Sequence, residues 1–313
     1  MSKTVSQRDA FWNRVFRSAK NDRNIVVVAA DMGAPSLDRF RKELGFQFID
    51  VGIAEQQAIA VAAGLALAGK KVFAYAIAPF ITLRCYEQIR VDLAGMNIPV
   101  TLVGVGSGFS YEDSGPTHHA IEDISVMRIL PNVRVHNMTD SVMAAAFGEL
   151  SCTLPYPNYV RLDRHVLPTL YAEGHDFTAG LSVLKPGTET FLIATGSMVH
   201  KALAFARELK PRFPELGVID IYTLPIPEKP FLTALRNAKR LVTLEEHTLP
   251  GGLGSAVCEV LADHGLRIPV KRIGLTFRES YCYRYGGREN ILSFCGLGRK
   301  DLLGIISKFL SQH

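Results

Sequence analysis

The stretch QFIDVGIAEQQAIAVAAGLALAGKKVFAY at residues 47–75 holds one carboxylate, Glu55, between two largely apolar segments. The residues before Glu55 predict a buried strand, and those after it predict a helix rich in small residues that Gly69 closes. The next strand is expected at residues 70–78. Because burying an unpaired carboxylate is costly, the acid at this strand–helix junction must be paired, neutral or functional.

The same alternation of strand and helix extends in both directions from this stretch. NIVVVAAD at residues 24–31 is an apolar run that ends in Asp31, as in a central parallel strand with a functional group at its carboxyl end. One helix is expected at residues 80–96, a strand at residues 98–106, and further elements up to about residue 164. This pattern predicts an α/β fold.

A polar, glycine-containing stretch at about residues 171–183 predicts a linker, and a second alternating series begins at residues 189–197. We therefore expect two doubly wound, three-layer domains, at residues 1–175 and 183–313, the first with a mostly parallel sheet. A chain of 313 residues suits two domains of about 150 residues each.

Composition narrows the class of protein. A hydrophobic content of 48% supplies two cores and argues against disorder. The net charge of +5 is modest, and no basic run is interleaved with aromatic residues. The sequence therefore disfavours a nucleic-acid partner and is compatible with a small phosphorylated substrate.

The cysteines and the apolar runs indicate the cellular compartment in which the protein is expected. The five cysteines are odd in number and form no CxxC motif, which argues for a reducing environment and against a disulfide framework or a zinc site. The polar N-terminus lacks the apolar core of a signal peptide, and the longest apolar runs are interrupted before they reach membrane-span length. We expect a cytoplasmic protein with no membrane contact.

Several chemically active side chains have ordinary structural interpretations. Glu55 could be a first-turn acid at the positive end of its helix, and the aromatic residues of APFITLRCYEQIR could be core residues. Arg161 and Arg164 could be solvated at a strand end. A metal site is a weak alternative, because adjacent histidines rarely face one ion; its candidate ligands are His118, His119, Glu122 and Asp123.

Three motifs, which follow one another along the chain, favour a functional interpretation over a structural one: residues 48–69, GPTHHAIEDISVMRILPNV at residues 115–133, and LVTLEEHTLPGGLGSAV at residues 241–257. Together they resemble the C-terminal half of transketolase, and they are similar to the matching part of 1-deoxyxylulose-5-phosphate synthase. The resemblance runs from about residue 31 to near the C-terminus. It implies a thiamine-diphosphate pyrimidine-binding domain followed by the transketolase C-terminal domain.

The resemblance implies roles for individual residues. Glu55 would hydrogen-bond the ring nitrogen of the cofactor's aminopyrimidine, which favours the imino tautomer that deprotonates the thiazolium carbon. Phe80 would stack on the aminopyrimidine ring, and Arg84 would pair with Glu55 or a substrate oxygen. The full cofactor-binding set implied is Asp31, Ile53, Glu55, Phe80, Arg84 and Tyr86.

Substrate contacts are implied for three further positions. His118 would bond to the donor's oxygens and assist proton transfer, as a second catalytic residue. Arg164 would hold a substrate phosphate through its guanidinium fork, and Ser36 belongs to the active-site loop after the first strand. Ser114 stands where larger transketolases carry an acid, and VGVGSG lacks their additional histidine, which leaves the sugar-phosphate specificity open.

The chain has no GDG motif, with which this family binds Mg²⁺ and the diphosphate. The resemblance therefore implies that no metal is bound by this chain. A partner subunit, the N-terminal half of a split transketolase, would supply Mg²⁺, with two copies of each chain in the active assembly. Glu245, Glu246 and His247 are expected to face a subunit interface.

Three functions remain open from the sequence. The first is a split transketolase subunit that transfers a two-carbon ketol unit between phosphorylated sugars or related acceptors. The second is the beta subunit of a thiamine-diphosphate-dependent 2-keto acid decarboxylating synthase or dehydrogenase. The third is a non-catalytic structural subunit.

Overall fold

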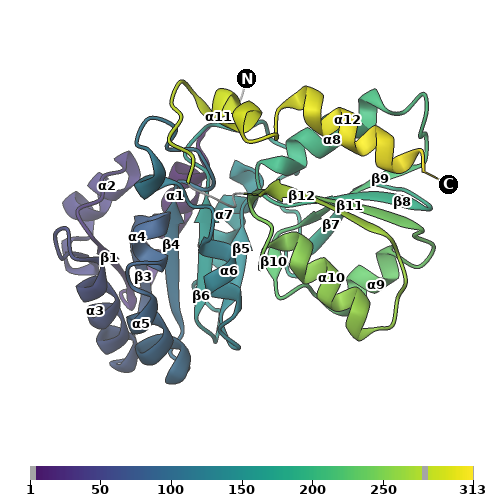
Figure 1. Cartoon of the computed structure of the whole chain (residues 1–313). Coiled ribbons are helices and arrows are strands. Elements are labelled where there is room, and N and C mark those ends of the chain that lie inside the picture. Colours follow the sequence, from purple (N-terminus) through teal and green to yellow (C-terminus); the bar gives the residue numbers. More distant parts are fainter. Residues whose placement is uncertain (1–4, 277–280, 313) are drawn as a thin grey trace.

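The computed structural model describes residues 5–276 and 281–312, and within them two β-sheets are each covered by helices on both faces (Figure 1). The first sheet has seven strands in the order β10-β5-β6-β4-β3-β1-β2, and the second has five in the order β12-β11-β8-β9-β7. All neighbouring strands are parallel except β10 with β5 and β7 with β9. The predicted α/β class and doubly wound architecture are confirmed.

Apart from β10, the first sheet and its helices come from the N-terminal half of the chain. Its elements are α1 (Gln7–Asn21), β1 (Ile25–Ala29), α2 (Pro35–Glu43), η1 (Gly45–Gln47), β2 (Phe48–Asp50), α3 (Glu55–Leu67), β3 (Lys71–Ile77), α4 (Ala78–Thr82), α5 (Tyr86–Gln88), η2 (Ile89–Gly95), β4 (Val100–Val105), η3 (Pro116–His118), α6 (Asp123–Arg128), β5 (Arg134–Asn137), α7 (Ser141–Leu150) and β6 (Asn158–Leu162).

The C-terminal half of the chain contains the second sheet and one strand of the first. Its elements are β7 (Leu181–Lys185), β8 (Thr190–Ala194), α8 (Met198–Glu208), β9 (Leu216–Ile221), β10 (Thr223–Leu224), α9 (Glu228–Ala234), β11 (Arg240–Thr248), α10 (Leu253–Asp263), β12 (Val270–Leu275), α11 (Arg288–Phe294) and α12 (Arg299–Leu310). Strand β10 leaves its own half and pairs with β5 of the first sheet. The domain boundaries at 1–175 and 183–313 stay a prediction.

Alternating strand residues divide the core between the two faces of the first sheet. Val27, Phe73 and Val103 pack under α1, α2 and α7, whereas Val28, Ala74 and Leu102 pack under α3 and α6. This period of two is the direct consequence of strand geometry. In the second sheet, α8 and α12 cover one face and α9 and α10 cover the other (Figure 1).

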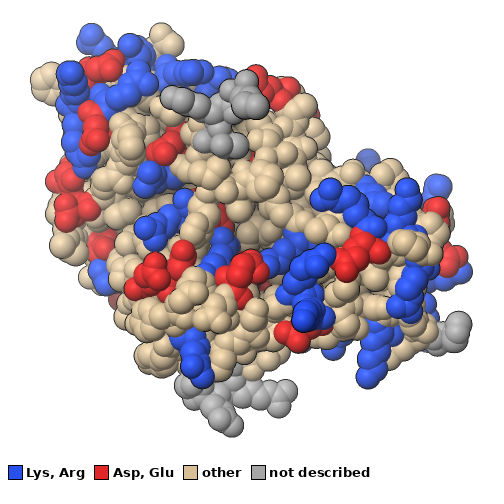
Figure 2. Space-filling view, turned by 90° about the horizontal axis from the view of Figure 1, so that it is seen from above, with Lys and Arg blue, Asp and Glu red and all other residues tan. Residues whose placement is uncertain are grey.

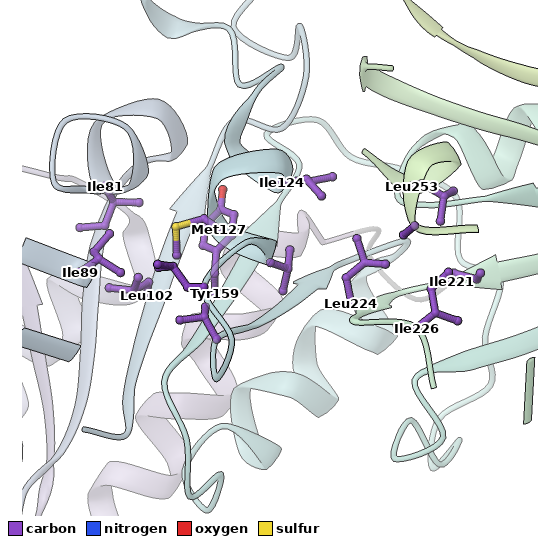
Figure 3. Close-up of a cluster of buried hydrophobic side chains, with 14 of the residues drawn as sticks. Ile81, Ile89, Leu102, Ile124, Met127, Tyr159, Ile221, Leu224, Ile226 and Leu253 are labelled. Carbon is purple, nitrogen blue, oxygen red and sulfur yellow. The ribbon is translucent and has the colours of Figure 1, made fainter. Parts of the chain in front are cut away.

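One apolar cluster continues from the first sheet into the second. Figure 3 shows side chains from both halves of it, and its labelled members are Ile81, Ile89, Leu102, Ile124, Met127, Tyr159, Ile221, Leu224, Ile226 and Leu253. All of these labelled side chains are buried. The hydrophobic effect therefore joins the two halves as well as stabilising each of them.

Two segments differ from the expected elements. The single helix predicted at residues 80–96 is three short elements, α4, α5 and the π-helical η2. At the end of α4, the Thr82 hydroxyl donates to the carbonyl of Ala78 at 2.6 Å, a side-chain-to-backbone bond that competes with the regular helical bonding. Strand β7 begins inside the expected linker; it is a short edge strand whose Val183 is exposed, so it lacks an apolar run.

Candidate active site

The residues singled out from the sequence gather at the carboxyl ends of the parallel strands of the first sheet. Asp31 follows β1, Glu55 follows β2, Phe80 follows β3, and Arg164 follows β6. His118 lies in the long loop after β4. Loops at this edge of a parallel sheet are where ligands bind in doubly wound folds.

Glu55 is the first residue of α3, and only 4% of its side chain surface is exposed. Its Oε2 accepts a hydrogen bond from Nη1 of Arg84 at 2.7 Å, and the Arg84 side chain is 45% exposed. The positive end of α3 also favours a negative charge at this position. The carboxylate at the strand–helix junction is therefore paired, as the cost of burial requires.

Arg84 and His118 both contact Phe80. The guanidinium carbon of Arg84 lies 4.4 Å from the centroid of the Phe80 ring, and the His118 ring meets the same ring edge-on at 5.0 Å. Burial, followed by the nearby charge of Arg84, lowers the pKa of His118 below its ordinary value. This shift favours the neutral imidazole, which can both donate and accept a hydrogen bond.

Tyr111 extends this set of contacts to Arg164. Its ring centroid lies 5.7 Å from that of His118, and the guanidinium carbon of Arg164 lies 4.8 Å from the Tyr111 centroid. Tyr111 was not a sequence candidate, although it lies in the same loop as His118. The side chains that are joined in this continuous series of contacts, which we call the site row, are Glu55, Arg84, Phe80, His118, Tyr111 and Arg164.

The remaining sequence candidates make no hydrogen bond, ion pair or aromatic contact with the site row among the described residues. Ile53 is 78% exposed, just before α3. Tyr86 is half-buried against the core at the start of α5. Ser36 is buried in α2, and its hydroxyl has no hydrogen-bond partner in the part of the chain that the structure describes.

Asp50 organises the loops after β1 and β2 and was missed from the sequence. Its Oδ1 accepts hydrogen bonds from the backbone N–H groups of Asp31 and Gly52, each at 3.0 Å. Burial alone would raise the pKa of Asp50, but these bonds and one from Arg41 outweigh it and lower the pKa. Asp31 is held with φ of +49°, a conformation uncommon outside glycine. An acid at the end of a predicted strand was the available signal.

Arg161 is buried, so its interpretation as a solvated strand end is wrong. Its Nε donates to Oδ2 of Asp123 at 2.7 Å, and the Tyr159 hydroxyl donates to the same oxygen at 2.8 Å. Asp123 is thereby committed to a structural ion pair. Within residues 5–276 and 281–312, no cluster of three or more His, Cys, Asp and Glu side chains is arranged to hold a metal ion.

Glu245, Glu246 and His247 do not face outward, so the expectation of a subunit interface there is wrong. These residues are 0%, 4% and 1% exposed within the single chain. Glu245 accepts hydrogen bonds from the backbone N–H groups of Leu253 and Gly254, at 2.7 and 2.9 Å, and so stabilises the first turn of α10.

The molecular surface shows charges of both signs. On the face shown in Figure 2, basic and acidic side chains are interspersed, and a continuous basic surface of the kind that binds nucleic acid is not seen there. Among the described residues, none of the helices combines the length and apolar character needed to cross a bilayer.

The sequence matches two families in succession: "Transketolase, pyrimidine binding domain" at residues 3–169 and "Transketolase, C-terminal domain" at residues 180–292. The chain belongs to the transketolase family. The match confirms the resemblance seen in the three motifs, and 1-deoxy-D-xylulose-5-phosphate synthases are also among the matching proteins.

Two relatives and one solved structure place the chain more closely within the transketolase family. A subunit of the apulose-4-phosphate transketolase of Phocaeicola vulgatus is 33% identical, with 98% of each chain covered. The 6-deoxy-6-sulfo-D-fructose transketolase subunit SqwH of Clostridium sp. (strain MSTE9) is 35% identical over 86% of this chain and 84% of its own.

The solved structure is described as "Split gene transketolase, inactive beta4 tetramer". It is 31% identical, with a TM-score of 0.87 over 97% of this chain and 98% of its own. Together these proteins favour the first of the three predicted functions, the split transketolase subunit, over the 2-keto acid and structural alternatives.

Proposed function

We propose that this chain is the pyrimidine-binding subunit of a split transketolase, which transfers a two-carbon ketol unit between phosphorylated sugars or related acceptors. The observation that carries the proposal is the site row. It joins a buried carboxylate, an imidazole and an exposed arginine in continuous contact, in a chain that matches one subunit of a transketolase over nearly its full length.

The residues present fit the aminopyrimidine of thiamine diphosphate. Glu55 engages Arg84 through Oε2, and among the described residues Oε1 accepts no hydrogen bond, which leaves an acceptor for a protonated ring nitrogen. Phe80 offers a flat apolar surface beside it. When bound, thiamine diphosphate supplies a nucleophilic carbon and an electron sink for the ketol unit.

In this proposal, each residue of the site row that faces a ligand has one task. Glu55 shares a proton with the ring nitrogen, and Phe80 fixes the plane of the ring. His118 donates a hydrogen bond to a substrate oxygen and exchanges a proton with it. Arg164 holds the phosphate at the far end. Around the cofactor lie Asp31, Ile53, Arg84 and Tyr86, and Ser36 contacts the substrate.

We further propose that Mg²⁺ and the diphosphate are bound by a partner subunit, the N-terminal half of the enzyme, in an assembly with two copies of each chain. The sequence supports this division, because it contains no GDG motif. The split-gene relative whose four beta chains associate is described as inactive. Five free cysteines fit a cytoplasmic enzyme.

Calorimetric titration tests the proposal. Thiamine diphosphate with Mg²⁺ is titrated into this chain alone, into a GDG-bearing partner chain alone, and into their mixture. We expect binding with the full affinity only in the mixture, accompanied by ketol transfer to phosphorylated acceptors. Tight binding by this chain alone would contradict the division of the site, and an absence of binding in all three titrations would overturn the enzymatic proposal.

A further inference from the structure

Glu246 connects the second half of the chain to the loop that carries His118. It lies on β11 of the five-stranded sheet, and its Oε1 accepts a hydrogen bond from the backbone N–H of Phe109 at 2.7 Å. A Cβ at the neighbouring Gly108, whose φ is +59°, would stand 2.5 Å from this oxygen. The close approach therefore requires glycine at position 108.

Arg288, on α11, joins Glu246 to the turn that carries Arg164. Its Nη2 donates to Oε2 of Glu246 at 2.8 Å, and its Nη1 lies 2.8 Å from Oδ2 of Asp163. The Arg288 side chain is 12% exposed, and those of Glu246 and Asp163 are 3% and 1% exposed. Low exposure makes these charge-assisted hydrogen bonds stronger than surface ion pairs.

The charge pair of Glu246 and Arg288 has partners in both segments that carry a proposed substrate-binding residue. Phe109 lies near the start of the loop at residues 107–119, which carries His118. Asp163 directly precedes Arg164, and its Oδ1 accepts a hydrogen bond from the backbone N–H of His165 at 2.8 Å. The two segments also meet, because the Ser107 hydroxyl donates to Oδ2 of Asp163 at 3.2 Å.

From this geometry we infer that Glu246 and Arg288 are positioning residues for the substrate. By holding the loop and the turn against one buried charge pair, they fix the separation between His118, at the reacting end of the substrate, and Arg164, at its phosphate end. The second half of the chain thus contributes to acceptor recognition without touching the acceptor. This inference rests on the proposed function for its kinetic consequence.

The test compares Glu246→Gln with Glu245→Gln in the complex with the partner subunit. Glu245 is the matched control, because it is the adjacent buried glutamate and its hydrogen bonds go to α10. The readout is the ratio of kcat/KM for a phosphorylated sugar acceptor to that for its unphosphorylated counterpart. This ratio does not change when a variant merely lowers the fraction of folded enzyme.

For Glu246→Gln we expect the ratio to fall by about tenfold or more. This factor corresponds to the loss of one charge-assisted hydrogen bond between Arg164 and the substrate phosphate. We expect the ratio to stay within about twofold of wild type for Glu245→Gln, since the hydrogen bonds of Glu245 go to α10 and not to the loop or the turn. Hydrogen exchange on this chain alone should show faster exchange at residues 107–119 and 163–165 in Glu246→Gln only.

An unchanged ratio together with unchanged exchange in Glu246→Gln would overturn the inference. If the wild-type complex transfers no ketol unit, the proposed function fails instead, and the exchange measurement alone still decides whether the pair holds the loop. Should Glu246→Gln not fold, Ser197→Ala replaces it. The Ser197 hydroxyl donates to Oε2 of Glu246 at 3.1 Å, and its loss should produce a smaller change in the same direction.

Discussion

Replacing Glu55 by Gln should separate catalysis from stability. The substitution keeps the shape of the side chain and removes its charge. Because Arg84 is 45% exposed, solvent screens its ion pair with Glu55, which then contributes no more than about 1 kcal/mol. The interaction of the charge with the end of α3 adds up to about 1 kcal/mol. The free energy of unfolding should therefore fall by less than about 2 kcal/mol.

Activity should fall much further. Proton transfer by a positioned side chain contributes about 10²- to 10⁴-fold to rate, which corresponds to about 2.7–5.4 kcal/mol of transition-state stabilisation. Ketol transfer by the reconstituted two-chain complex measures this loss at saturating thiamine diphosphate and Mg²⁺. Urea unfolding of this chain alone measures stability independently of the partner.

Glu87→Gln is the control, because Glu87 is an exposed glutamate on α5 that lies close to the site in sequence. It should leave both measurements unchanged. Turnover of Glu55→Gln within about threefold of wild type would refute the assigned role and favour a subunit that only scaffolds the complex. A loss of stability well above about 2 kcal/mol would refute the assumption that solvent screens the Arg84 pair.

Three other substitutions probe ionisable side chains in the site and in the core. Arg84→Met should move the acidic limb of the pH profile of kcat/KM to higher pH, because the Arg84 charge, after burial, helps to hold the pKa of His118 below its ordinary value; an unmoved limb would exclude His118 as the titrating group. Burial raises the pKa of Asp220 to about 7, so the folded carboxyl retains a proton that the unfolded chain releases, and stability falls as pH rises from about 4 to 7. In urea unfolding, Asp220→Asn should then be more stable than wild type at about pH 8, by at most about 4 kcal/mol, and should lose this advantage at about pH 4. Arg161→Leu should cost about 3–5 kcal/mol in guanidinium unfolding, because it leaves Asp123 without its cationic partner; adding Asp123→Asn should recover part of the loss, and strictly additive losses would contradict the coupling.

Local pattern was sufficient for the central strands and for Glu55, and the family resemblance supplied most of the other residues of the site row. Strands such as β1 and β4 are continuous apolar runs because both faces are buried, and such runs are readable without tertiary information. Glu55 was marked by its position at a strand–helix junction, whereas Phe80 and His118 became candidates through the resemblance to transketolase. Their placement at one edge of the sheet follows from the parallel topology.

The interactions that were missed join residues far apart in the chain. Asp163 and Arg288 meet across 125 positions, and neither lies in a segment whose periodicity marks it as a partner of the other. The sequence shows that Glu246 lies in a largely apolar strand. The direction in which its carboxylate points, however, depends on how the two sheets are packed. Such pairings are properties of the tertiary fold, so local spacing does not encode them.

Strand β10 has a consequence for how the protein folds. Thr223 and Leu224 pair with His136 and Val135, so the edge of the first sheet is completed by residues that are synthesised about 90 positions later. A fragment that ends at residue 175 would leave β5 with an unpaired row of backbone groups, which is a template for aggregation. The two halves should therefore unfold in one cooperative transition. A gene division at this junction would not give two halves that fold independently.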